Sequence, residues 1–62
     1  MQMQMTEIRD YAHRLFDAFG ERSLVEAAQK ARFFEEKGDR DEAKNWRRIE
    51  QTLQEIRGPR QS

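Results

Sequence analysis

The apolar residues of this chain recur at the three- and four-residue spacing of α-helices. Three segments show this spacing, at residues 6–19, 24–37 and 40–57. Their apolar stripes comprise Ile8, Tyr11, Ala12, Leu15, Phe16, Ala18 and Phe19; Leu24, Ala27, Ala28, Ala31 and Phe34; and Trp46, Ile49, Leu53 and Ile56. No segment alternates with the period of two that marks a half-buried strand. The pattern predicts three helices, and five residues at stripe centres are expected to be mostly buried: Leu15, Phe19, Phe34, Trp46 and Leu53.

Capping signals divide the first two helices. Thr6 is the expected N-cap of the first helix, and Gly20 is expected to end it. Ser23 is followed three residues later by Glu26, which is the pattern of a capping box at the start of the second helix. The connection between these helices is therefore only a few residues long, which predicts neighbours that run antiparallel.

The junction between the second and third helices falls at Gly38 and Asp39. Glycine suits the left-handed conformation that ends a helix, because it has no Cβ to clash there. The Asp39 carboxylate can accept a hydrogen bond from the Glu42 amide and so cap the next helix. The fold class predicted is all-α: a small three-helix bundle with short antiparallel connections.

The length of 62 residues allows a single domain, 1–62, with frayed termini expected at 1–5 and 58–62. A domain of this size buries only about 60% of the surface that its unfolded chain exposes. The chain has no cysteine, so neither a disulfide nor a thiolate metal site can add stability. Association of two copies is the remaining source of stability, and we expect a homodimer.

The charge balance disfavours polyanionic partners. Lys and Arg together number 12, as do Asp and Glu, so the formal net charge is zero. A neutral chain has no overall field to attract a polyanion. No apolar run approaches the length of a membrane span, and the N-terminus lacks the features of a signal peptide. These observations predict a cytoplasmic protein that does not bind membranes.

One polar cluster has the composition of a metal site. Asp10, His13 and Asp17 lie within about 60° of one another on the first predicted helix. They lie opposite the apolar stripe, where a charged face simply meets water. A single histidine also leaves no set of nucleophile, base and orienting group. We therefore expect no metal, no cofactor and no enzymatic activity.

A second polar cluster is basic, and it is the basis of an alternative function, nucleic-acid binding. It lies on the third predicted helix and comprises Lys44, Arg47, Arg48 and Arg57. In a helix-turn-helix protein such a helix would enter the major groove of DNA. Two acids, Glu50 and Glu55, interrupt the face, and the Gly38–Asp39 turn is shorter than the usual connection of that motif. Nucleic-acid binding is thus the alternative and not the favoured function.

Val25 and Phe33 lie away from the apolar stripe of the second helix. At about 100° per residue, Phe33 points roughly 160–180° away from the middle of that stripe. Two explanations remain open for Phe33. The second helix could be central and buried on two sides, or Phe33 could contact a second subunit or another partner. For the second case we predict a partner-binding surface at Val25 and Phe33.

The second half of the chain resembles a single tetratricopeptide-type helical hairpin. Ala31 stands where that pattern has a small residue, and Phe34 where it has an aromatic one. Gly38–Asp39 matches the turn, and Ala43 matches the small residue of the second helix. The chain departs from the pattern at Arg47, Glu50 and Glu55, which replace an aromatic residue, a small residue and a proline. One such hairpin is not an array, and arrays are the form that binds peptides.

A second resemblance is to short uncharacterised helical proteins of alphaproteobacteria and their phages. It rests on Gly38–Asp39, Ala43 and the run Trp46-Arg47-Arg48-Ile49. This resemblance implies a bacterial cytoplasmic origin and carries no activity. By analogy with small phage proteins, a host or other cellular protein is a further possible partner. The function predicted is a small protein-binding or self-associating helical module that acts through apolar helix faces.

Overall fold

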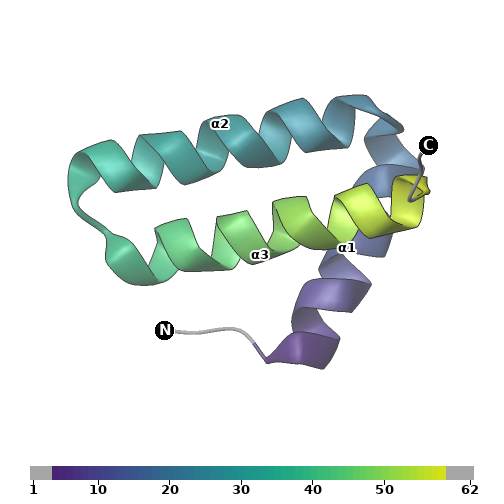
Figure 1. The fold of residues 1–62 in the computed structure, drawn as a ribbon, viewed down its shortest axis with the longest axis horizontal. Coiled ribbons are helices and arrows are strands. Elements are labelled where there is room, and N and C mark those ends of the chain that lie inside the picture. The colour runs from purple at the N-terminus through teal and green to yellow at the C-terminus, as the bar shows by residue number, and fades with distance from the viewer. Residues whose placement is uncertain (1–3, 59–62) are drawn as a thin grey trace.

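A computed structural model describes residues 4–58 and shows three α-helices (Figure 1). They are α1 (Met5–Phe19), α2 (Arg22–Lys37) and α3 (Arg40–Arg57). Residues 4–58 contain no strand. The predicted all-α three-helix bundle is confirmed, and the expected fraying at 1–5 and 58–62 falls mostly outside the described residues.

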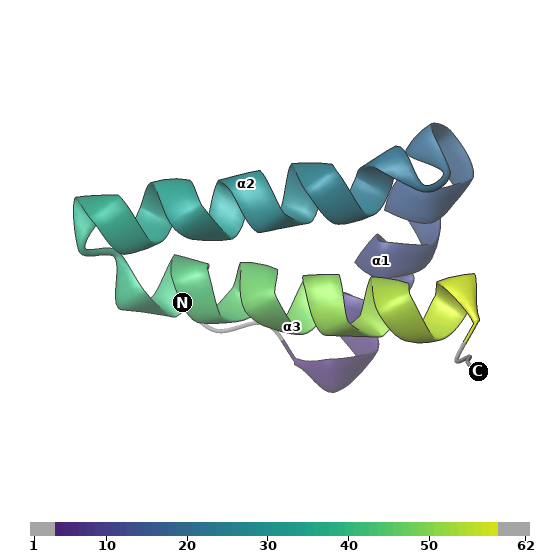
Figure 2. The same cartoon turned by 45° about the horizontal axis from the view of Figure 1, so that its top comes forward.

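The helices α2 and α3 form an antiparallel hairpin, and α1 crosses it obliquely near the C-terminal half of α3 (Figures 1 and 2). The most extensive contact is between α2 and α3, while α1 packs mainly on α3 and touches α2 less. As a result α3 is covered on two sides. The long side of α2 that faces away from α3 has no helix packed along it.

The turn between α2 and α3 has the predicted geometry. Gly38 is left-handed, with φ 83° and ψ 12°. The amides of Gly38 and Asp39 donate to the carbonyls of Glu35 and Phe34, at 3.2 and 2.9 Å. The Asp39 carboxylate accepts from the Glu42 amide at 3.3 Å. These bonds satisfy the end of one helix and the start of the next within two residues, which turns the chain back on itself.

Two predicted caps are wrong. The helix α1 begins before Thr6, with Gln4 as N-cap, because the Glu7 carboxylate reaches back to accept from the Gln4 amide at 2.9 Å. Ser23 is not an N-cap either, because α2 already begins at Arg22. The Ser23 hydroxyl donates instead to the Gly20 carbonyl at 2.6 Å, and the side chain is fully buried.

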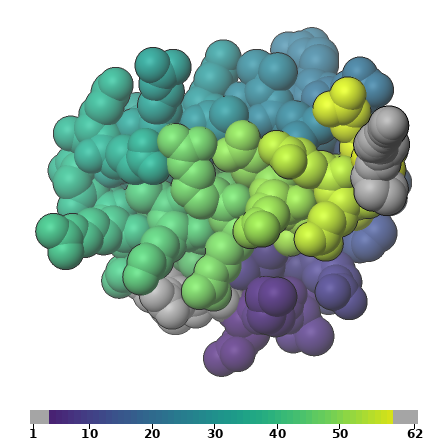
Figure 3. Space-filling model, viewed as in Figure 1, coloured from purple at the N-terminus to yellow at the C-terminus, as the bar shows by residue number. Residues whose placement is uncertain are grey.

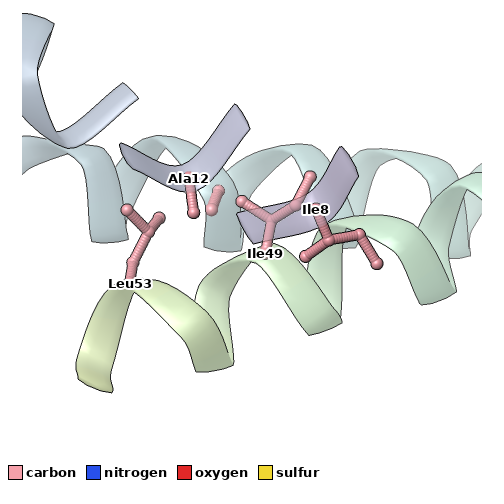
Figure 4. Packing of buried hydrophobic residues seen from close by; sticks show 5 residues of the cluster. Ile8, Ala12, Ile49 and Leu53 are labelled. Atoms are coloured by element: carbon pink, nitrogen blue, oxygen red, sulfur yellow. The ribbon is translucent and has the colours of Figure 1, made fainter. Parts of the chain in front are cut away.

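The core lies where α1 meets α3, with one side supplied by α2. Figure 4 shows Ile8 and Ala12 of α1 facing Ile49 and Leu53 of α3. These four residues and Ala27 of α2 form the buried cluster. The partly buried side chains packed against it are Leu15, Phe16, Leu24, Trp46 and Ile56.

The predicted core is correct in its centre and wrong at one edge. Leu53 is fully buried, and Leu15, Phe34 and Trp46 are partly buried. Trp46 also meets Tyr11 edge to face, with ring centroids 5.7 Å apart, which fixes α1 against α3. Phe19 is 49% exposed, because it is the last residue of α1 and the neighbouring helices do not cover that end fully.

The core assignment predicts a large effect at Leu53 and a small one at its exposed neighbour. Leu53→Ala should lower the free energy of unfolding by about 2–5 kcal/mol, since it leaves a cavity among large aliphatic side chains. Gln54→Ala on the same helix should change it by less than about 0.5 kcal/mol. Urea denaturation followed by circular dichroism measures both. Equal stabilities for the two variants would contradict the assignment.

Candidate protein-interaction surface

The outer face of α2, defined here by Arg22, Val25, Gln29, Phe33 and Glu36, lies opposite the buried face of that helix. The buried face comprises Ser23, Ala27 and Ala31. Val25 is two residues from Ala27, and Phe33 is two residues from Ala31. Each therefore points roughly 160° away from its buried neighbour. Both side chains are exposed, Val25 by 55% and Phe33 by 51%.

The Phe33 ring is exposed, but contacts with two neighbouring side chains restrict its orientation. Its ring meets that of Phe34 edge to face, with centroids 5.2 Å apart and planes at 78°. The Lys37 ammonium lies over the Phe33 ring, 5.0 Å from its centroid. These contacts hold the ring in place, so that little side-chain entropy is lost if it enters an interface.

A shallow depression of about 380 Å³ lies beside the Phe33 ring. Its lining residues are Glu26, Gln29, Lys30 and Phe33. The outer face therefore combines an exposed aromatic ring with a neighbouring depression that is lined by one acidic and one basic side chain. Such a pairing of apolar centre and polar rim is typical of protein interfaces.

The exposure of Phe33 rules out one of the two explanations drawn from the sequence. A central α2 buried on two sides would leave Phe33 covered, and it is half exposed. Val25 and Phe33 lie on the same side of α2, within about 80° of each other around the helix axis. The structure thus brings together the two residues predicted to contact a partner.

Other exposed apolar side chains on α1 do not form a comparable surface. Met5 is its first residue and Phe19 its last, and both are exposed. They are separated by about 21 Å along the helix. Tyr11 lies between them, but its ring is engaged with Trp46.

The basic residues of α3 are not brought together as one patch. Arg47 is held by two carboxylates: Glu35 accepts from it through both oxygens, at 3.0 and 3.1 Å, and Glu50 accepts at 3.0 Å. Arg57 lies 3.8 Å from the Glu21 carboxylate, and helix geometry turns it about 180° away from Arg48. In Figure 3 α3 lies across the front of the molecule, between α2 and α1.

Lys44 and Arg48 remain as exposed cations on one side of α3. A nucleic-acid interface needs several phosphate contacts from one surface. Of the four predicted residues only Lys44 and Arg48 share one side of α3, with Arg40 one turn before them, while Arg47 is paired with two carboxylates. The structure therefore does not bring the four predicted residues together as one phosphate-binding surface.

The pair formed by Glu35 and Arg47 links α2 to α3 across the hairpin. Hydrogen bonds from Arg47 lower the pKa of the Glu35 carboxyl, and partial desolvation opposes them. Hydrogen bonds to Glu35 and Glu50 raise the pKa of Arg47 above its ordinary value. Sequence reasoning assigned Arg47 to a binding face and missed this role, because its main partner is 12 residues away.

Asp10, His13 and Asp17 are all exposed on α1. Within residues 4–58 no group of three or more His, Asp or Glu side chains is placed to hold a metal ion. Over the same residues no helix has both the length and the apolar character needed to cross a bilayer.

The Glu35–Arg47 pair predicts a pH effect with a definite sign. Because the folded-state pKa of Glu35 is lowered, the pair stabilises the fold above the unfolded pKa, and this contribution is lost as the pH falls through the folded pKa. Arg47→Gln should return the Glu35 pKa toward its ordinary value, as measured by NMR titration of the side-chain carboxyl carbon. Arg48→Gln is the matched control and should leave it unchanged. A Glu35 pKa that is the same in the Arg47 variant would show that the pair does not form.

Comparison with known proteins adds no relative: no family model, no curated protein and no solved structure matches this chain. The resemblance to a tetratricopeptide hairpin and the similarity to alphaproteobacterial and phage proteins accordingly remain predictions.

Proposed function

We propose that this protein is a small binding module that associates with a second copy of itself through the outer face of α2, without catalysis. The observation that carries the proposal is the joint exposure of Val25 and Phe33 on the side of α2 that no other helix covers. Removing apolar surface from water favours association at roughly 25 cal/mol per Å². Two exposed apolar side chains on one rigid helix supply the centre of such an interface.

A second copy is favoured as the partner for two reasons. A symmetric interface uses one surface twice, so the side chains left outside a small core are buried on both subunits at once. The chain also has zero net charge, so two copies approach without overall repulsion. Another cellular or host protein remains the alternative partner for the same surface.

The position of the surface on the fold supports this assignment. Val25 and Phe33 are separated by about 12 Å along the axis of α2. They lie within a helix of 16 residues whose opposite side is packed against α3, the most extensive contact in the molecule. A surface built on a rigid helix loses little freedom when it binds. The exposed ends of α1 lack this arrangement.

Sedimentation velocity from low micromolar concentration upward tests the proposal. The wild-type chain should move from monomer toward dimer as its concentration rises. Phe33→Gln should raise the dimer dissociation constant by about tenfold, since loss of an aromatic anchor at an interface typically costs more than 1 kcal/mol. The chain should stay folded by circular dichroism, because this side chain is outside the core.

Phe19→Gln provides the matched control, because Phe19 is exposed to nearly the same extent but lies on α1. This variant should dimerise like the wild type. A folded monomer at every concentration would refute self-association. An equal loss of dimer in both variants would place the interface elsewhere.

A further inference from the structure

We infer that the two copies pair through antiparallel α2 helices, around a two-fold axis that passes beside Gln29. This inference rests on the proposed function and adds the orientation and register of the interface. It follows from the order of charged and apolar residues along the outer face of α2. That order is Arg22, Val25, Gln29, Phe33 and Glu36, and the charged residues Glu26 and Arg32 lie at its edges.

The order is complementary to its own reverse around Gln29. Arg22 stands seven residues before Gln29 and Glu36 seven residues after it. Val25 and Phe33 stand four residues to either side. In an antiparallel pair centred on Gln29, Arg22 of each copy faces Glu36 of the other, and each Val25 faces a Phe33. Two ion pairs then flank two apolar contacts.

The residues at the two edges of the face pair differently. Glu26 and Arg32 lie three residues before and after Gln29, but about 60° to either side of it around the helix axis, so they lie on opposite edges of the face. Lys30 shares the edge of Glu26, so Lys30 of one copy lies near Glu26 of the other in this arrangement. Opposite charges across an interface fix its register, while like charges disfavour wrong pairings.

A parallel pairing in the same register would be repulsive at both ends of the face. It would place Arg22 against Arg22 and Glu36 against Glu36 at short distance. It would also set Phe33 against Phe33 and Val25 against Val25. The pair of phenylalanines requires a wider spacing between the helices than the pair of valines. The antiparallel arrangement places a small side chain against a large one at both sites, so the helices can remain evenly spaced.

The structure leaves these groups available for the pairing. Within one chain the Arg22 guanidinium is 3.9 Å from the Glu26 carboxylate, and the Arg22 side chain is 80% exposed. A contact this long and exposed is weak and competes little with an interface. The depression beside Phe33 is lined by Glu26, Gln29 and Lys30, close to where Val25 of the second copy would lie.

Single cysteine variants test the arrangement, because the chain has no cysteine of its own. Gln29→Cys places the two thiols beside the two-fold axis, where the Cα atoms can approach the roughly 4.4–6.8 Å that a disulfide requires. Arg22→Cys places them about 21 Å apart along the helices, too far to bridge. Under mild oxidation, Gln29→Cys should form a disulfide-linked dimer on a non-reducing gel. Arg22→Cys should run on the same gel at the mass of a single chain, because its thiols are not cross-linked.

The outcomes separate this inference from the proposed function. Cross-linking of both variants indicates a parallel pair and overturns the inference. Cross-linking of neither, or of Arg22→Cys alone, in chains that sediment as dimers overturns the antiparallel register but leaves self-association standing. A chain that sediments as a monomer overturns both.

A charge exchange tests the cause of the orientation. Glu36→Arg should weaken the dimer about tenfold in sedimentation, because each Arg22 then faces an arginine. Adding Arg22→Glu in the same chain should restore it, because the ion pairs re-form with their charges reversed. If the double variant does not regain the dimer affinity of the wild type, residues 22 and 36 do not face each other across the interface.

Discussion

Close approach of α2 and α3 depends on small side chains between them, and this constraint shapes the rest of the molecule. Ala27 and Ala31 of α2 and Ala43 of α3 are all buried. Alanines let two helices pack tightly, but they leave little volume in which larger side chains can be hidden. The largest fully buried side chains are only Ile8, Ile49, Leu53 and Ser23. A thin core of this kind leaves aromatic residues at the surface, and the position of each one then matters.

The surface left by that constraint is the basis of the proposed function. The outer face of α2 carries two exposed apolar side chains. In the antiparallel pairing that we infer, Arg22 and Glu36 at its two ends meet residues of opposite charge on the second copy. The charges of α3 are used differently, since Arg47 ties α3 to α2 through Glu35. One helix face thus holds the hairpin together, while the opposite face of α2 is open to a partner.

Local patterns in the sequence predicted the helices, the Gly38–Asp39 turn and the outward direction of Phe33, because each depends on a few neighbouring residues. The starts of α1 and α2 were predicted wrongly, since several residues can cap a helix and loop geometry decides between them. Periodicity placed Phe19 in the core, but it does not show how far a neighbouring helix extends. The burial of Asn45, and the partnership of Glu35 and Arg47, arise from tertiary packing and had no local signal.

Contacts between Val25 and Phe33 across two chains provide the most direct test of the account. Within one α2 helix these side chains are about 12 Å apart along the axis, too far for a nuclear Overhauser effect. An isotope-filtered NMR experiment on a mixture of labelled and unlabelled protein detects contacts between copies only. The account predicts cross-peaks between the Val25 methyl groups and the Phe33 ring. Cross-peaks between Val25 and Val25, or none to either residue in a sample that is dimeric, would contradict it.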